Sequence, residues 1–351
     1  MLLNTPCVHG GDIYRRPIRL DFSVNVNPLG TPAAVKAAVR QAAEHLDAYP
    51  DPYCTRLREA LSASLHVPAD WVLCGNGAAE LIYQFVSSLH PERALLPAPS
   101  FADYETALRA AGCVLDYVPL LRKEGFLPTE GILDAITERT ELVMLCSPNN
   151  PTGRLVPRPL LGRILARCRE TGTWLFLDEC FTELTDRETP SLSRELHDGD
   201  RVFLLRAFTK TYAMAGLRLG YAVCPRREML ECICGQNQCW NVSAPAQAAG
   251  IAALGCGDWA EKARAVIRQE KRWLTGELEG LGIAVLPSDA NFLLLSGVSG
   301  LYEGLLKRGI LIRDCSSYRG LQHGDCRIAI KTHEENRMLL AAVREVLHGQ
   351  N

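Results

Sequence analysis

Seven short apolar runs between residues 71 and 223 constrain the fold of this 351-residue chain more than any other feature. Stretches with helical periodicity separate them. Apolarity within each run is largely continuous rather than alternating, which is typical of strands that are covered on both faces. The pattern predicts an α/β fold built on a doubly wound, mostly parallel sheet. The runs are Trp71–Cys74, Ala94–Leu96, Val114–Val118, Leu142–Cys146, Trp174–Leu177, Val202–Leu205 and Leu219–Val223.

The segments on either side of these runs have a different pattern. Residues 1–30 are irregular and rich in turn-forming Gly and Asn-Pro steps, so we expect an N-terminal arm that docks near the functional site. Residues 31–245 are expected to form the large domain. Residues 246–351 begin with a long helical stretch, interrupted near Gly255, and continue with short strands and helices. They predict a smaller α+β C-terminal domain.

The large domain is expected to begin with a helix. Thr31 is a suitable N-cap for it, and Pro32 is a suitable first helical residue because its missing N–H leaves no hydrogen bond unmade.

Charge and cysteine usage restrict the partners. Lys and Arg number 38 against 40 Asp and Glu, a net charge of -2, so no basic footprint indicates nucleic acid, and small molecules are the expected partners. The 14 cysteines are scattered without CxxC pairs, so neither a metal site nor a disulfide framework is expected. There is no signal-peptide pattern and no run of about 18 apolar residues. We therefore expect a cytoplasmic protein without a membrane span.

Small and polar residues follow several of the apolar runs. In an open α/β sheet these positions face the ligand, because ligands bind at the carboxyl ends of the strands. Gly75-Asn76-Gly77-Ala78-Ala79 opens a helix and offers bare amides to an anion. Asn150 stands on a turn after one strand, and Asp178 comes directly out of the next. Lys210 follows the strand after that, with Arg218 eight positions later.

The residue types at these strand ends predict a site for pyridoxal 5′-phosphate. A lysine amine attacks a carbonyl only when deprotonated, so Lys210 is expected in a desolvated or cation-rich place that lowers its pKa. Arg218 can bind a phosphate through two parallel hydrogen bonds. Asp178, buried at a strand end, needs a cationic partner, and the protonated ring nitrogen of the cofactor is one.

On these residues the chain resembles the fold-type I pyridoxal-phosphate enzymes of the aspartate aminotransferase superfamily. The motifs of residues 147–153 (Ser-Pro-Asn-Asn-Pro-Thr-Gly), Leu177-Asp178-Glu179 and Thr209-Lys210 are shared with the branch that holds histidinol-phosphate aminotransferases and threonine-phosphate decarboxylases. His9-Gly10-Gly11 and residues 312–321 resemble the decarboxylases in particular. The resemblance runs through essentially the whole chain.

The resemblance implies a role for each candidate residue. Lys210 would carry the covalent link to the cofactor, Asp178 would pair with the ring nitrogen, and Asn150 would hydrogen-bond the ring O3′ oxygen. These three residues are the implied catalytic set. Phe101 would stack on the face of the cofactor ring. The amides of Ala78 and Ala79, the hydroxyl of Thr209 and Arg218 would bind the cofactor phosphate. Tyr49 would reach the same phosphate across the interface of a homodimer with shared active sites.

The resemblance also implies how a substrate is bound. Arg327 would hold the substrate carboxylate, and Arg313 and His9 would hold the phosphate of a small phosphorylated amino acid. The alternative for the two arginines is an ion pair between domains, and for His9 it is a capping or surface histidine. Two positions depart from the family pattern: Phe181 replaces a tyrosine common in the aminotransferases, and Ala207 replaces a hydroxyl residue that often binds phosphate.

The implied activity is decarboxylation of L-threonine O-3-phosphate to (R)-1-amino-2-propanol O-2-phosphate for cobalamin biosynthesis. An aminotransferase acting on a substrate such as histidinol phosphate stays open as an alternative, because both reactions use nearly the same catalytic residue types. A third alternative is a non-catalytic pyridoxal-phosphate-binding regulator. It has no support in the sequence, since no DNA-binding module is appended.

Overall fold

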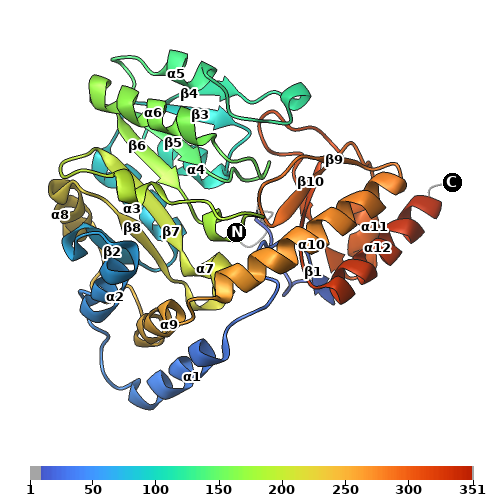
Figure 1. Ribbon diagram of the computed structural model, residues 1–351, viewed down its shortest axis with the longest axis horizontal. Coiled ribbons are helices and arrows are strands. Elements are labelled where there is room, and N and C mark those ends of the chain that lie inside the picture. Colours follow the sequence, from blue (N-terminus) through green and yellow to red (C-terminus); the bar gives the residue numbers. More distant parts are fainter. Residues whose placement is uncertain (1–8, 350–351) are drawn as a thin grey trace.

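The protein is described by a computed structural model over residues 9–349, in which a seven-stranded sheet and a four-stranded sheet lie in separate parts of the molecule (Figure 1). We call the seven-stranded sheet with its helices the large unit and the four-stranded sheet with its helices the small unit. The boundaries at residues 30 and 245 stay a prediction. In spatial order the large sheet consists of β2 (Val72–Gly75), β8 (Gly220–Val223), β7 (Val202–Ala207), β6 (Trp174–Asp178), β5 (Leu142–Cys146), β3 (Arg93–Ala98) and β4 (Val114–Pro119).

The large sheet confirms the mostly parallel arrangement that the sequence predicts. Within it β8 runs antiparallel to both of its neighbours, β2 and β7. The other adjacent strands pair in parallel. The carboxyl ends of β5, β6 and β7 therefore meet at one edge of the sheet.

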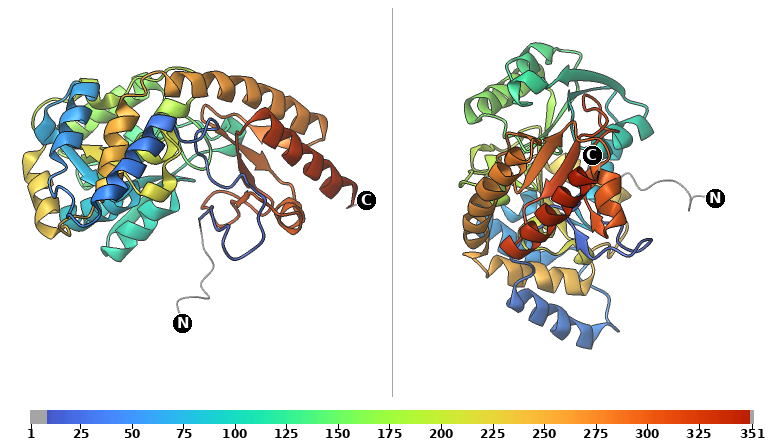
Figure 2. Two further views of the ribbon diagram at one scale, coloured as in Figure 1. Left: turned by 90° about the horizontal axis from the view of Figure 1, so that it is seen from below. Right: turned by 90° about the vertical axis from the view of Figure 1, so that its right-hand side faces the viewer.

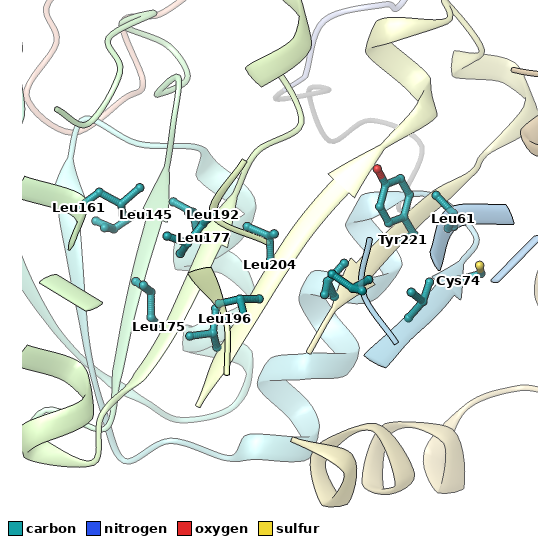
Figure 3. Packing of buried hydrophobic residues seen from close by; sticks show 14 of the residues in the cluster. Leu61, Cys74, Leu145, Leu161, Leu175, Leu177, Leu192, Leu196, Leu204 and Tyr221 are labelled. Carbon is teal, nitrogen blue, oxygen red and sulfur yellow. The ribbon is translucent and has the colours of Figure 1, made fainter. Parts of the chain in front are cut away.

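Helices cover both faces of the large sheet. Val143 and Leu145 of β5 belong to one apolar cluster, whereas Leu142 and Met144 belong to another on the opposite face, as the two-residue period of a strand requires. Figure 3 shows part of the first cluster, where Leu145, Leu177 and Leu204 of adjacent strands lie close to one another. Each fully buried leucine of this kind contributes roughly 1.5–3 kcal/mol. The first cluster includes side chains of α2 (Thr55–Leu65), α5 (Gly131–Ala135), α6 (Arg158–Thr171) and α9 (Ala244–Leu254), and the second includes those of α3 (Ala78–Leu89), α4 (Ala102–Ala110) and α8 (Arg227–Gln236).

The small unit is an antiparallel sheet covered by helices (Figure 2). Its longest helix, α10 (Trp259–Gly280), begins five residues after α9 ends at Leu254, so the predicted interruption near Gly255 is confirmed. A capping box formed by Thr332 and Glu335 starts the last helix, α12. The other elements of this unit are β12 (Arg313–Asp314), β13 (Cys326–Ala329), β10 (Phe292–Ser296), β9 (Ala284–Leu286), α11 (Leu301–Lys307) and α12 (His333–His348).

The N-terminal segment connects the two units. Its short strand β1 (Leu20–Asp21) pairs in parallel with β11 (Ile310–Leu311), and Phe22 lies in the apolar core of the small unit. A few residues later Asn27 contacts the large unit, where its backbone N–H donates to the carbonyl of Lys210 at 2.9 Å. The same segment is thus held by both units.

The predicted cap at Thr31 is wrong. The first helix, α1 (Ala33–Ala42), has Pro32 at its N-cap position without a side-chain hydrogen bond. The Thr31 hydroxyl donates instead to the carbonyl of Ala213 at 2.8 Å. The hydroxyl therefore donates to a distant carbonyl instead of accepting from a local backbone N–H, and α1 is held by packing on α9. Short 3-10 helices occupy connections at η2 (Ala43–His45), η3 (Ala69–Trp71), η4 (Arg122–Glu124), η5 (Thr182–Leu184), η6 (Leu192–Glu195) and η7 (Ala215–Leu217).

Candidate active site

A cavity of about 430 Å³ lies at the carboxyl ends of β5, β6 and β7, between the large and small units. Residues from β12, β13 and the N-terminal segment close its other side. With the exception of Tyr49, the site residues predicted from the sequence all line it: His9, Ala78, Ala79, Phe101, Asn150, Asp178, Thr209, Lys210, Arg218, Arg313 and Arg327.

Asp178 ends β6 and is 6% exposed. Tyr104 Oη donates to its Oδ2 at 2.6 Å, and the backbone N–H of Cys180 donates to its Oδ1 at 2.8 Å. Burial raises the pKa of Asp178, and the thiol and backbone N–H of Cys180, the hydroxyl of Tyr104 and the charge of Lys210 oppose that rise. The next acid, Glu179, points elsewhere, since Ser191 and the N–H of Leu192 satisfy its carboxylate beside a separate cavity of about 190 Å³.

Lys210 lies on α7 (Phe208–Thr211), a single turn that follows β7 directly. Burial, together with the positive charges of Arg327 and Arg218, lowers the pKa of Lys210 to about 8. A larger fraction of this amine is therefore neutral near pH 7 than of a surface lysine. The structure gives Lys210 the desolvated, cation-rich surroundings expected of a lysine that attacks a carbonyl.

The N-terminus of α3 faces the same cavity. Gly77, at its N-cap position, has a φ of +85° and supplies no side-chain cap, so the first amides of the helix are not capped from within the chain. A Cβ at Gly77 would overlap the guanidinium of Arg218. Thr209 lies in the same wall of the cavity. Ala78, Ala79, Thr209 and Arg218 all line the cavity. Because their backbone amides, hydroxyl and guanidinium are donors to an anion, we call these four residues the anion cup.

Asn150 and Phe101 also line the cavity. The Oδ1 atom of Asn150 accepts a hydrogen bond from Arg327 Nη1. The ring of Phe101 packs edge-on against Tyr104, with centroids 5.5 Å apart and planes at 81°. The amide therefore ties the turn after β5 to the small unit.

Arg327 and Arg313 form no ion pair with a carboxylate anywhere in residues 9–349, which excludes an interdomain salt bridge within that range. Arg327 is 6% exposed, and its Nη2 donates to the carbonyl of Ser23 at 2.8 Å. Its buried Nε atom has no hydrogen-bond partner. Burial lowers the pKa of Arg327, as expected for a guanidinium kept from water without an anion. A buried cation of this kind is prepared for an anionic ligand.

His9 stands at the mouth of the cavity. Its Nε2 lies 3.0 Å from Asp103 Oδ1, and its ring centroid lies 5.9 Å from that of Phe101. Gly10 fits closely behind it, since a Cβ there would lie 2.6 Å from the carbonyl oxygen of Ser23. His9 and Gly10 therefore line the cavity, and the predicted docking of an arm over residues 1–30 stays a prediction.

Tyr49 lies outside the cavity on an exposed surface. It is 79% exposed and stacks on Trp240, with ring centroids 4.5 Å apart. Within a single chain it contacts none of the residues of the anion cup.

Several lining residues were not predicted from the sequence, among them Asn25 and Cys180. Asn25 is 1% exposed, and its Oδ1 has no hydrogen-bond partner. Tyr318 lies 5.5 Å from the guanidinium of Arg313, measured to the ring centroid. Cys180 contributes its amide to Asp178, as described above. Of the two departures from the family pattern, Phe181 lies 5.5 Å from Lys210 Nζ, and Ala207 offers no hydroxyl to the cup.

No helix in the part of the chain that the structure describes is long and apolar enough to cross a membrane. Within residues 9–349 no group of three or more His, Cys, Asp or Glu side chains is placed to hold a metal ion.

Pyridoxal 5′-phosphate fits what these residues offer. The anion cup supplies the donors that a phosphate monoester accepts, and a Cβ at Gly77 would fill it. The buried Asp178 suits a protonated ring nitrogen, and the low pKa of Lys210 suits attack on an aldehyde. The fold and the cavity therefore define a pyridoxal-phosphate-dependent enzyme with an aspartate aminotransferase-like fold.

Comparisons with known proteins agree. The chain matches the aminotransferase class I and II family over residues 17–343, and it belongs to that family. It is 39% identical to the threonine-phosphate decarboxylase of Salmonella typhimurium, over 94% of this chain and 92% of that protein. It is 36% identical to the histidinol-phosphate aminotransferase of Symbiobacterium thermophilum, over 92% and 89%. Among solved structures, the histidinol-phosphate aminotransferase of Clostridium acetobutylicum superposes with a TM-score of 0.87 at 30% identity, over 94% and 99%.

The family uses pyridoxal 5′-phosphate, and its members are typically homodimers. The protein is therefore a pyridoxal-phosphate enzyme of the group that contains threonine-phosphate decarboxylases and histidinol-phosphate aminotransferases.

Proposed function

We propose that the protein decarboxylates L-threonine O-3-phosphate to (R)-1-amino-2-propanol O-2-phosphate, an amino alcohol phosphate for cobalamin biosynthesis. The observation that carries the proposal concerns two arginines, Arg327 and Arg313, which are buried in the cavity wall. Neither forms an ion pair with a carboxylate within residues 9–349. A substrate with both a carboxylate and a phosphate supplies an anion for each of them. The 39% identity to a threonine-phosphate decarboxylase supports the same assignment.

The chain's own groups divide the work as follows. Lys210, Asp178 and Asn150 hold the cofactor ring with Phe101 on its face, and the anion cup holds its phosphate. When bound, the cofactor supplies an electron sink for the pair left at the substrate Cα. Arg327 binds the substrate carboxylate, and Arg313 and His9 bind the substrate phosphate. Burial of the two arginines strengthens their contacts with the substrate.

Lys210 delivers the proton that replaces CO₂ at Cα. With a pKa of about 8 its amine carries a proton for most of the time at neutral pH, and yet it gives that proton up more easily than a surface lysine does. Phe181 places an apolar ring beside Lys210 where the aminotransferases usually have a phenol. Residue 181 therefore offers the Lys210 amine no hydroxyl with which it could exchange a proton.

We also propose that a second copy of the chain covers the surface around Tyr49. Tyr49 and Trp240 are 79% and 47% exposed and form a stacked apolar pair. In a homodimer with shared active sites, Tyr49 would reach the cofactor phosphate of the other subunit. Light scattering of the purified protein tests this: a dimer for the wild type and a monomer with weakened cofactor binding for Tyr49→Ala are expected, and a monomeric wild type with full cofactor affinity would contradict it.

Histidinol phosphate is the second candidate substrate, in a transamination. It is favoured by the 36% identity to a histidinol-phosphate aminotransferase. Such a substrate carries a phosphate but no carboxylate, so it would leave one of the two buried arginines without an anion.

The deciding experiment uses the purified protein loaded with pyridoxal 5′-phosphate and L-threonine O-3-phosphate, without a keto acid. CO₂ and the amine product are followed over many turnovers. Catalytic CO₂ release establishes the decarboxylase. Absence of CO₂, together with conversion of the cofactor to its pyridoxamine form by histidinol phosphate or glutamate, would establish the aminotransferase instead.

A further inference from the structure

Tyr104 is a fully buried tyrosine on α4, and it touches the candidate acid directly. Its side chain is 0% exposed, and its hydroxyl donates to Asp178 Oδ2 at 2.6 Å. The two residues lie 74 positions apart in the sequence. Neither the fold nor packing alone requires a hydroxyl at this place, since Phe176 and Phe203 fill neighbouring positions in the same apolar cluster.

The direction of the hydrogen bond is set by the surroundings. Burial raises the pKa of Tyr104 well above its usual value, so the phenol keeps its proton and donates it. The other titratable groups that face Asp178 are the thiols of Cys146 and Cys180 and the amine of Lys210. Burial also raises the pKa of both thiols, so they stay neutral. The phenol of Tyr104 and the thiol of Cys180 are therefore both neutral donors to the ionised carboxylate, and a hydroxyl is a stronger hydrogen-bond donor than a thiol.

The aromatic ring of Tyr104 has a second contact with the site. It packs edge-on against Phe101 at 5.5 Å and against Phe176 at 5.8 Å, between ring centroids. Phe101 is the residue expected on the face of the cofactor ring. One side chain therefore touches both the acid and the aromatic residue between which that ring would lie.

We propose that Tyr104 is a positioning residue for the cofactor: its hydroxyl keeps the Asp178 carboxylate ionised and oriented toward the ring nitrogen, and its ring supports Phe101. The proposal rests on the cofactor role of Asp178 that is part of the proposed function. It does not depend on which substrate is used.

The test is Tyr104→Phe, which removes one oxygen and leaves the ring contacts in place. Loss of a hydrogen bond to a charged group predicts cofactor binding about 10- to 100-fold weaker at neutral pH. Since the lost donor stabilised the ionised carboxylate, the pKa of Asp178 rises further. The acid limb of cofactor affinity then moves to higher pH, by about 1 to 2 units.

Affinity is measured by titrating the cofactor-free protein with pyridoxal 5′-phosphate across pH, with the absorption band of the bound cofactor as readout. Tyr221→Phe is the matched control, because Tyr221 is also buried but belongs to the apolar cluster on the opposite face of the sheet. It is expected to keep the wild-type affinity and pH profile. Circular dichroism checks that both variants are folded.

A double-mutant cycle separates positioning from general packing. With Asp178→Asn already present, Tyr104→Phe is expected to change cofactor affinity by less than about twofold, because the charge it serves is gone. An unchanged affinity and pH profile for folded Tyr104→Phe, or an equal effect with and without Asp178→Asn, would overturn the proposal. The cofactor titration contains no substrate, so its result does not depend on the reaction. A wild type that binds the cofactor but releases no CO₂ would refute the proposed function, whereas the role of Tyr104 would still be tested by the titration.

Discussion

Gly77→Ala adds a single methyl group to the anion cup, and the structure allows its effect to be worked out in two parts. The first part is backbone strain. Gly77 has a φ of +85° and a ψ of 160°, a combination that residues with a Cβ rarely adopt. Holding alanine there costs about 1–3 kcal/mol of folding stability, equally in the free and the cofactor-loaded protein.

The second part is the overlap of the new Cβ with the guanidinium of Arg218. The three atoms nearest to that Cβ all belong to the guanidinium end of the Arg218 side chain, so the arginine side chain is the group that moves. Displacing it from the cup removes a charge-assisted hydrogen bond to the cofactor phosphate. That loss weakens cofactor binding by about 10- to 100-fold.

Urea unfolding of the cofactor-free protein measures the first part, and titration with pyridoxal 5′-phosphate measures the second. Gly162→Ala is the control: Gly162 lies within α6, and a Cβ there meets no atom within 4 Å. It is expected to raise stability by about 0.5–1 kcal/mol and to leave cofactor affinity unchanged. If Gly77→Ala binds the cofactor as tightly as the wild type, the cup is not the phosphate site and the reasoning is refuted.

Three further predictions use the charges around the cavity. The rate at which the cofactor reacts with Lys210 is expected to rise with pH up to about 8 and to level off above it, because the folded-state pKa of this lysine is lowered and the neutral amine is the reactive form. Stopped-flow absorbance measures this rate. A rate that keeps rising up to pH 10 would contradict a low pKa. Arg327→Met keeps most of the side-chain volume and removes the charge, so KM for the substrate should increase by about 10- to 100-fold. The pKa of Lys210 should also rise, and steady-state assays across pH measure both effects. An unchanged KM would exclude Arg327 from substrate binding. Asp325→Asn breaks an ion pair with Arg122 in which the Asp325 side chain is 0% exposed, so urea unfolding should show a loss of about 3 kcal/mol in the free energy of unfolding. Glu345→Gln breaks a largely exposed ion pair with Arg308 and should cost less than about 1 kcal/mol. Equal losses would show that burial of the first pair is unimportant.

Sequence patterns predicted the sheet well because a strand buried on both faces appears in the sequence as a short continuous run of apolar residues, which is a local signal. The run Leu142–Cys146 coincides with β5, and each of its residues is buried. The positions of Asp178 and Lys210 followed from the same signal, since the parallel topology puts residues after successive strands at one edge. For this reason the predicted cofactor residues, with the exception of Tyr49, line one cavity even though they come from distant segments.

Contacts between distant segments leave no such local signal. Thr31 has every local feature of a helix cap, yet its hydroxyl bonds Ala213, 182 positions away. Tyr104 fits the apolar face of an amphipathic helix, so periodicity alone classes it as core. Asn25 sits in an irregular segment without periodicity, and its place in the cavity depends on the fold of the small unit around Phe22. These positions required the three-dimensional structure.

The pairing of β1 with β11 has a consequence for the order in which the chain folds. The last strand of the large sheet ends at Val223, whereas Leu20 and Asp21 find their partners only at Ile310 and Leu311. Closing so long a loop is slow compared with forming contacts between neighbouring segments. In refolding followed by pulse-labelled hydrogen exchange, the amides of the large sheet are therefore expected to gain protection before that of Phe22, which donates to Leu311.

The same late event completes the catalytic cavity. Ser23 and Asn25 belong to the segment that docks last, and both line the cavity. A chain that has folded only its large sheet thus has its lysine and its anion cup but lacks one wall of the pocket. Substrate-binding competence then arrives with the final step of folding rather than before it, so partly folded chains cannot turn over substrate.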